Sequence, residues 1–134
     1  MPPKHDRIAR LITARQGTCR EGDVENRLAE LNKLNEGLSG NVTKLEIGIL
    51  ATLANDTRYR IVRLLSKSET ELCVCEIEPV LDVSSSAVSH ALSDLYEAGL
   101  VDRQKDGKWR YYSITDCAEQ ILRAIDCTRQ FRTE

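Results

Sequence analysis

The chain has 134 residues, enough for one globular core with extensions and too few for two cores of ordinary size. Apolar residues make up 41%, and no apolar run reaches the roughly 18 residues of a membrane span, so we expect no transmembrane helix. The net charge of −2 excludes a chain that is basic throughout, although local groups of bases can still contact phosphate. The N-terminus lacks the apolar segment and cleavage site of a signal peptide, which predicts a cytoplasmic protein in a reducing compartment.

Three helices are predicted in the first part of the chain. Apolar residues at helical spacing predict a short helix over residues 5–16 that ends before Gly17. A second helix begins at Asp23 and carries an apolar stripe along residues 24–38, which needs a partner surface. The sequence Thr43-Lys44-Leu45-Glu46 matches a capping box, which predicts that the third helix begins at Thr43.

The second part of the chain has the pattern of a helix-turn-helix followed by a hairpin. After a helix that restarts at Asn55, residues 72–81 and 87–96 predict two short helices joined by a polar turn. The spacing of the second helix places Tyr96 on its buried face. Apolar and aromatic residues flank Asp106-Gly107, a strong signal for a two-residue hairpin turn. A last helix, capped near Thr115, extends to about residue 131.

These elements predict a mainly α fold with a small β-hairpin wing, which is a winged helix-turn-helix. We expect residues 1–42 to form an N-terminal helical extension used for dimerisation and as a possible source of a ligand donor. Residues 43–134 are expected to form the DNA-binding domain, with a C-terminal dimerisation helix. Double-stranded DNA and a second copy of the chain are therefore the expected partners.

Two groups of polar side chains predict contact with duplex DNA. A recognition helix presents small polar side chains at its N-terminal end because that end enters the major groove. Folding needs no positive charge at a hairpin tip, whereas a neighbouring phosphate backbone attracts it. The predicted DNA contacts are Ser84, Ser85, Ser86, Ser89, His90, Arg103, Lys105, Lys108 and Arg110. Two alternatives remain open: the serines only cap the helix, and the bases belong to an ordinary solvated hairpin.

Cys73 and Cys75 are the closest pair among the five cysteines. In a reducing compartment, close cysteines more often bind metal or carry out redox chemistry than form structural disulfides. On a regular helix, side chains two residues apart point about 200° apart, so we expect that one ion bonds both sulfurs only by distorting the helix. The surrounding glutamates oppose thiolate formation, so ion affinity should rise with pH. A pair of buried structural cysteines is the alternative.

The sequence Glu71-Leu72-Cys73-Val74-Cys75-Glu76, followed by residues 84–100 and Gly107-Lys108-Trp109, resembles the ArsR/SmtB family of metal-responsive repressors. The resemblance covers about residues 45–115. It implies a homodimer that binds operator DNA and leaves it when a metal binds. It also implies that the outer helices form the dimer interface, which here are the helix bearing the 24–38 stripe and the final helix.

One position departs from the arsenic-sensing members of this family. Relatives with three cysteines on this helix have the third three residues after the second, where this chain has Glu78. A pyramidal arsenic(III) or antimony(III) site needs three thiolates, so the pair is incomplete. Cadmium and lead sensors of the family take further thiolates from an N-terminal extension of the other subunit, a role that Cys19 can fill here. Cys117 and Cys127 are the competing donors.

The expected function is therefore a repressor released by As(III) or Sb(III) bound to Cys73, Cys75 and Cys19. A repressor that responds to Cd(II), Pb(II) or Zn(II), a thiol redox switch and a protein-interaction module are the alternatives. No obligatory cofactor is expected. The sequence contains no nucleophile–base pair, phosphate loop or acid–base constellation, so we expect no enzymatic activity.

Overall fold

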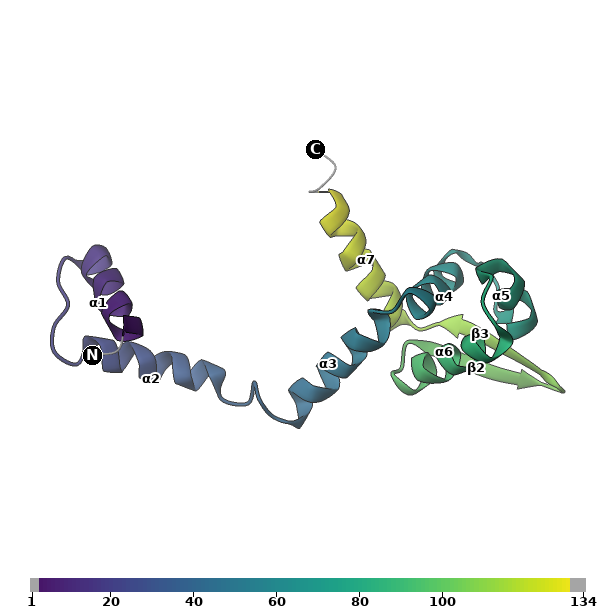
Figure 1. Ribbon diagram of the computed structural model, residues 1–134, viewed down its shortest axis with the longest axis horizontal. Coiled ribbons are helices and arrows are strands. Elements are labelled where there is room, and N and C mark those ends of the chain that lie inside the picture. Colours follow the sequence, from purple (N-terminus) through teal and green to yellow (C-terminus); the bar gives the residue numbers. More distant parts are fainter. Residues whose placement is uncertain (1–2, 131–134) are drawn as a thin grey trace. The chain divides into compact units, whose positions relative to one another are not determined.

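The computed structural model describes residues 3–130 and divides into two compact units, Met1–Lys44 and Leu45–Glu134 (Figure 1). The first unit contains α1 (Pro3–Gln16) and α2 (Asp23–Asn35), and α3 (Asn41–Leu53) begins at its end. Gly17 ends α1 as predicted: its φ is 90°, and its N–H donates to the Thr13 carbonyl at 2.8 Å. Within the described residues, no helix has both the length and the apolar character needed to cross a bilayer.

The connector of the first unit is fixed by the carboxylate of Asp23. This group does not cap its own helix; it accepts from the Arg20 N–H at 2.9 Å and from Gln16 Nε2 at 3.1 Å. Val24 is buried, and it lies in the first turn of α2. The predicted start of α3 at Thr43 is wrong, because the helix begins two residues earlier and the Thr43 hydroxyl donates to the Gly37 carbonyl.

The second unit follows the predicted order, with one additional strand. Its elements are α4 (Asp56–Lys67), β1 (Leu72–Cys73), α5 (Val74–Leu81), α6 (Ser85–Glu97), β2 (Val101–Asp106), β3 (Trp109–Ile114) and α7 (Asp116–Gln130). Asn55 caps α4 by accepting from the Arg58 N–H at 3.0 Å, and Thr115 caps α7 by accepting from the Ala118 N–H at 3.3 Å. The predicted winged helix-turn-helix is confirmed.

The wing is part of a three-stranded antiparallel sheet in the order β1-β3-β2. The expected hairpin joins β2 to β3, but its two-residue turn is Gly107-Lys108 and not Asp106-Gly107, because Asp106 still pairs with Trp109. The short β1 pairs Leu72 with Tyr112 and Cys73 with Tyr111. The predicted helix over residues 72–81 is therefore wrong at its start, because its first two residues are extended. Pairing with a strand almost forty residues away decides their conformation.

One apolar core holds the helices against the sheet. Each of α4, α5 and α6 contributes the apolar face that the helical spacing predicts, and the strands add the base of the wing. The most deeply buried large side chains are Ile61, Val62, Ile77, Val88, Leu92, Leu95, Leu100, Val101 and Leu122. This packing fixes α5 and α6 as a rigid pair in front of the wing.

Candidate functional site

The two sulfurs of the Cys73-Val74-Cys75 segment meet at the N-terminus of α5. Cys73 is the N-cap residue, with φ −78° and ψ 151°, and its Sγ accepts from the Cys75 N–H at 3.4 Å. The Cys73 N–H in turn donates to Glu76 Oε1 at 2.9 Å, which completes a capping box. The Cys75 thiol donates to Cys73 Sγ at 2.9 Å.

This geometry corrects the expected divergence of the two side chains. The 200° separation assumes that both residues are helical, but an N-cap residue is extended and its side chain turns back over the first turn. The cap therefore brings Cys73 Sγ toward Cys75 without unwinding α5. The statement that an ion must distort the helix to meet both sulfurs is wrong.

The two thiols differ in exposure: Cys73 is buried and Cys75 is exposed. The hydrogen bond to Cys73 is the main cause that raises the pKa of Cys75, followed by desolvation and by the charges of Cys73 and Glu76. Cys75 therefore keeps its proton near neutral pH, and a soft ion that bonds its sulfur must displace that proton.

The pair fits two positions of a thiolate site and no more. Sulfurs bonded to one tetrahedral ion at roughly 2.3 Å lie about 3.8 Å apart, so the 2.9 Å separation needs to open by less than about 1 Å. Nearby carboxylates already have partners: Glu76 accepts from Cys73, and Glu78 accepts from the Ser85 hydroxyl at 2.7 Å. Within residues 3–130, no three His, Cys, Asp or Glu side chains are arranged to hold a metal ion.

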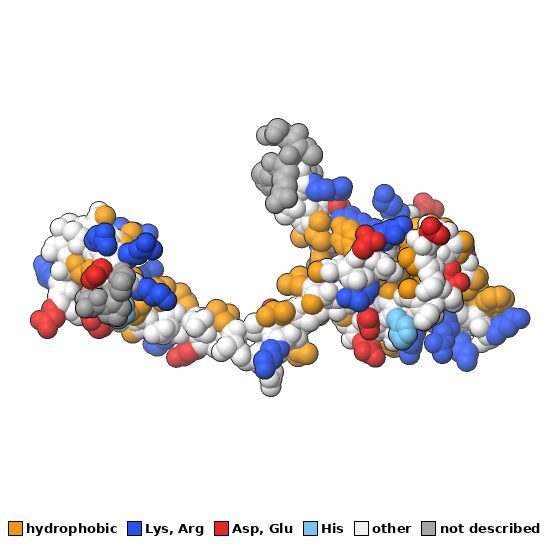
Figure 2. All heavy atoms as spheres, in the orientation of Figure 1, with side chains coloured by type: hydrophobic (Ala, Val, Ile, Leu, Met, Phe, Trp, Pro, Cys, Tyr) orange, Lys and Arg blue, Asp and Glu red, His pale blue; other side chains and the backbone are white. Residues whose placement is uncertain are grey.

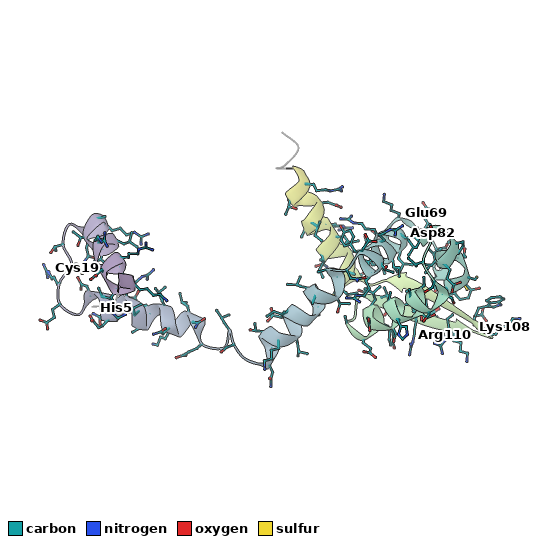
Figure 3. All side chains as sticks on the ribbon, viewed as in Figure 1. His5, Cys19, Glu69, Asp82, Lys108 and Arg110 are labelled. Carbon is teal, nitrogen blue, oxygen red and sulfur yellow. The ribbon has the colours of Figure 1, made fainter. Side chains whose placement is uncertain are left out.

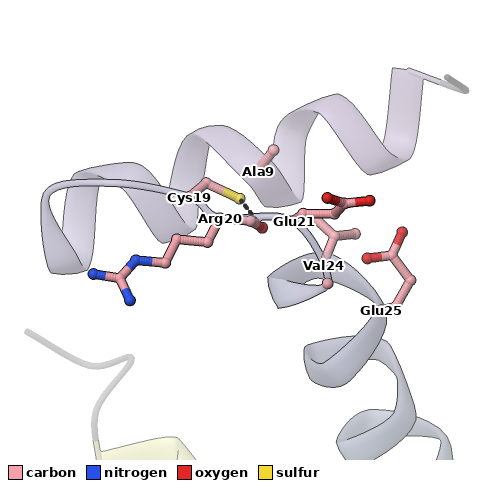
Figure 4. A pocket seen from close by; sticks show the side chains of 7 residues that line it. Ala9, Cys19, Arg20, Glu21, Val24 and Glu25 are labelled. Carbon is pink, nitrogen blue, oxygen red and sulfur yellow. Dashed lines mark hydrogen bonds between the residues drawn. The ribbon is translucent and has the colours of Figure 1, made fainter.

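Cys19 lies in the connector between α1 and α2 and is half-buried. It lines a pocket of about 510 Å³ whose wall includes the carboxylates of Glu21 and Glu25 (Figure 4). Among the described residues its thiol forms one hydrogen bond, to the Arg20 carbonyl at 3.9 Å. The structure thus brings together Cys73 and Cys75 alone and leaves Cys19 in the first unit.

The other two cysteines lie at opposite ends of α7. Cys117 is in its first turn and Cys127 near its end, and both are exposed. Ten residues of helix separate them by about 15 Å, which excludes one ion bound to both in the same chain.

The serines before and within the recognition helix α6 have different partners. Ser84 is the N-cap and accepts from the Ala87 N–H at 3.1 Å, and Ser85 is the residue that donates to Glu78. Ser86, Ser89 and His90 are exposed, and their side chains make no hydrogen bond to the described part of the chain. The helix therefore presents three free polar side chains in its first two turns.

The strand register places the bases of the wing on one face. Paired residues of an antiparallel sheet share a face, and neighbours along a strand alternate. Lys105 pairs with Arg110, and Arg103 pairs with the buried Tyr112, so these three bases share the face that packs on the core and α6. Lys108 lies in the turn at the wing tip, where Figures 2 and 3 show the basic side chains projecting.

The acids of the wing lie on the opposite face. Asp102 and Asp106 alternate with the bases along β2. The charged residues on the helix-facing side of the wing are therefore all basic, although the two strands together contain both acids and bases.

Tyr96 is a site residue that the sequence reasoning missed. Its place in the apolar spacing of α6 predicts a core position, but the side chain is 40% exposed, so that prediction is wrong. The Arg103 guanidinium lies 4.0 Å from the centre of its ring. Tyr96 and Gln104, together with Arg103, Lys105 and Arg110, line a pocket of about 240 Å³ between the helix and the wing. Three bases and no acid make this pocket suitable for an anion.

An apolar groove lies between the ends of α3 and α4 and the outer part of α7. Its volume is about 530 Å³, and its lining residues are Leu50, Leu53, Ala54, Tyr59, Ile121, Ala124, Ile125 and Thr128. Beside it, Arg63 of α4 donates two hydrogen bonds to Asp126 of α7, at 3.2 and 2.8 Å. This ion pair lowers the pKa of Asp126 and raises that of Arg63.

Comparison with known proteins identifies the family of the chain. The bacterial regulatory protein arsR family matches residues 55–103. A putative arsenical resistance operon repressor ArsR of Halobacterium salinarum is 46% identical over 93% of this chain and 97% of its own length. A cadmium resistance transcriptional regulatory protein CadC of Listeria innocua is 34% identical over 78% of this chain and 86% of its own.

Solved structures show the same fold. The crystal structure of M. tuberculosis Rv0081 matches with a TM-score of 0.59 and 32% identity, covering 70% of this chain and 93% of that one. The family predicted from the cysteine box and the wing is confirmed. The chain belongs to the arsR family and is a winged-helix transcriptional repressor, not an enzyme.

Proposed function

We propose that the protein is a cytoplasmic homodimer that binds operator DNA and is released when As(III) or Sb(III) bonds to Cys73 and Cys75. The observation that carries this proposal is the 2.9 Å approach of the two sulfurs at the cap of α5, directly before the recognition helix. The name of the 46% identical relative, an arsenical resistance operon repressor, supports the choice of ion.

The third thiolate of the site comes from Cys19 of the second copy of the chain. Arsenic(III) needs three sulfurs, and the described residues of one chain bring two together. Binding of Cys19 to an ion would break no strong hydrogen bond, because among the described residues its thiol donates only to the Arg20 carbonyl, at 3.9 Å. Cys117 and Cys127 are the competing donors. The cadmium-resistance relative makes Cd(II), with Pb(II) and Zn(II), the second candidate inducer.

The cap explains how ion binding reaches the DNA-binding helix. Opening the two sulfurs by up to about 1 Å to hold an ion weakens the hydrogen bond that Cys73 Sγ accepts from the Cys75 N–H, and complete loss of an N-cap costs a helix about 1 kcal/mol. Each thiol gives its proton to a hydroxide that leaves arsenic as water, so no oxidant is required. The loosened α5 is coupled to α6 through Glu78 and Ser85 and through the buried Ile77. The recognition helix then loses the position that fits the major groove.

The DNA-binding surface consists of the first two turns of α6 and the helix-facing side of the wing. Ser86, Ser89 and His90 are placed to reach base edges, while Ser84 and Ser85 hold the helix N-terminus toward phosphate. The wing supplies phosphate contacts from Arg103, Lys105, Lys108 and Arg110. The apolar groove of α3 and α7 and the exposed leucines of α2 are the proposed dimer surfaces.

Titration of the reduced protein on its own upstream DNA tests this function. We expect salt-dependent binding and release by arsenite or antimonite at concentrations where Zn(II) leaves the complex intact. Because each thiol proton leaves with an arsenic hydroxide as water, release by arsenite should not strengthen as the pH rises through the thiol range, whereas release by Cd(II), which displaces the protons into solution, should strengthen. Release by peroxide without any ion, reversed by a thiol reductant, would instead identify a redox switch.

Tyr96 provides a test of the wing surface. Tyr96→Leu should weaken operator binding about two- to fivefold, because an exposed cation–π contact contributes about 0.5–1 kcal/mol to holding a guanidinium. Tyr96→Phe keeps the ring and should bind as the wild type does. The salt dependence should change little in either variant, since Arg103 is still present. Equal affinities of the Leu and Phe variants, measured by fluorescence anisotropy, would remove Tyr96 from the surface.

A further inference from the structure

The exposed face of α1 carries four bases and only one acid beside them. The helix turns its half-buried Ile8, Ala9 and Ile12 to one side, while the opposite side is open to solvent. The exposed bases are Lys4, Arg7, Arg10 and Arg15, with Asp6 as the only acid of the helix. Figure 2 shows Lys and Arg side chains spread over this part of the first unit.

None of these four bases forms an ion pair within the described residues. Other arginines of the chain do: Arg27 pairs with Glu30, Arg58 with Asp94 and Arg63 with Asp126. The four exposed bases of α1 are therefore free of ion pairs within the described residues, and Asp6 is the one acid of the helix.

Charge is divided unevenly between the two units. Residues 1–44 hold eight Lys or Arg and six Asp or Glu, for a net +2, whereas residues 45–134 hold eleven against fifteen, for −4. The unit with the recognition helix and wing is thus acidic overall, which disfavours its approach to DNA beyond the wing itself. A separate basic surface compensates for this repulsion if it contacts the same polyanion.

We propose that the basic face of α1 is a second DNA-contacting surface, which binds the phosphate backbone of the duplex that flanks the operator. From Lys4 to Arg15 the helix rises about 16 Å, the axial length of about five phosphates on one strand. This inference rests on the proposed operator binding and adds a sequence-independent contact outside the helix-turn-helix.

The packing of α1 favours DNA over the other polyanions that a basic helix can bind. A helix that lies in a membrane surface inserts its apolar face, but here that face is half-buried in its own unit and only Leu11 is largely exposed, at 49%. The acidic residues beside the cysteine pair are another possible partner for the bases of α1. Two of them, Glu76 and Glu78, already accept hydrogen bonds within their own unit, so these carboxylates are less available to a basic helix.

Matched variants of the full chain test the proposal. Arg7→Gln with Arg10→Gln removes two bases from the face, and Arg27→Gln with Lys33→Gln removes two exposed bases from α2 of the same unit. Both pairs are exposed, so circular dichroism should show unchanged helix content. Each protein is titrated on the operator alone and on the operator with about one helical turn (~10 bp) of duplex on each side.

We expect the wild type and the α2 variant to bind the longer duplex more tightly than the shorter one. The α1 variant should lose this advantage, with affinity for the long duplex about tenfold lower and a salt slope smaller by about 0.9 for each lost contact. Release by arsenite should be retained in all three proteins.

Several results would overturn the inference. One is a salt slope of the α1 variant equal to that of the wild type, together with equal affinity of the wild type for the short and the long duplex. Another is an unchanged DNA titration together with loss of binding to anionic phosphatidylserine vesicles, which would assign the face to a membrane. A loss of arsenite response without a change in DNA affinity would assign it to the cysteine site. If the wild type binds neither duplex, the proposed function and this inference fail together.

Discussion

Replacing Cys75 by serine is expected to leave operator binding within about twofold of the wild type and to abolish release by arsenite. The side chain is exposed, and a serine hydroxyl can replace the thiol as the donor to Cys73 Sγ, so the ion-free state should be preserved. The inducer, in contrast, loses one of three thiolates. Changes in the outer shell of a metal site already cost 10–100-fold in affinity, so loss of a direct ligand should raise the arsenite needed for release by more than about 100-fold.

Cys73 requires two substitutions because its sulfur has two roles. A serine at this position keeps an N-cap acceptor for the Cys75 N–H, whereas an alanine removes it at a cost of about 1 kcal/mol. Both variants should ignore arsenite, and only the alanine variant should also bind operator more weakly.

Cys117→Ser is the matched control, since it removes an exposed thiol of α7 that is outside the pair. Titrations that follow anisotropy of labelled operator against arsenite compare these four variants with the wild type. Arsenite release that is equal in the Cys75→Ser variant and the wild type would contradict the thiol site.

Local sequence signals predicted most of the fold. The helix termini at Gly17 and Asn55 and the presence of the hairpin, whose turn lies one residue later than predicted, depend on backbone preferences of a few neighbouring residues, and these can be identified without tertiary structure. The two-residue strand β1 is different, because its only support is pairing with Tyr111 and Tyr112. A strand this short has no periodicity of its own.

The error at β1 carried directly into the site. If Leu72 and Cys73 are assigned to a helix, the side chains of Cys73 and Cys75 are expected to diverge. The capping geometry that brings their sulfurs together is then not predicted. The acidic residue three positions into α5 was a usable signal, because Glu76 at that position is typical of a capping box. A cysteine is an unusual N-cap residue, so the sequence pattern alone does not indicate the capping box of Cys73 and Glu76.

The sequence predicts which residues form the DNA-contacting surface at the wing but does not predict how these residues are arranged in space. Alternation along β2 already separates Arg103 and Lys105 from the two aspartates. Which of the two faces meets the recognition helix depends on the packing of Val101 and Tyr112 in the core. The stacking of Arg103 on Tyr96 follows from that packing, so no local pattern indicates it.

The Glu78→Cys substitution should restore arsenite release to a Cys19→Ser variant. Removing Cys19 leaves two thiolates, and we expect the arsenite needed for release to rise by at least about tenfold. Glu78 lies three residues after Cys75 on α5, and side chains at this spacing lie on one face about 5–6 Å apart at Cβ. A thiol at position 78 therefore completes a three-sulfur set within one chain.

The variant Cys19→Ser with Glu78→Ser separates the new thiol from the loss of the carboxylate. Both substitutions at position 78 break the 2.7 Å hydrogen bond from the Ser85 hydroxyl, so both should shift operator affinity equally. Only the cysteine should bring the arsenite midpoint back to the wild-type range. If the single Cys19→Ser variant responds as the wild type does, Cys19 is not the third donor, and the same titration of Cys117→Ser and Cys127→Ser variants identifies which thiol is. If the third thiolate comes from the first unit of a second chain, the complete site forms only in the dimer. Arsenite binding then depends on dimerisation as well as on the cysteine pair at α5.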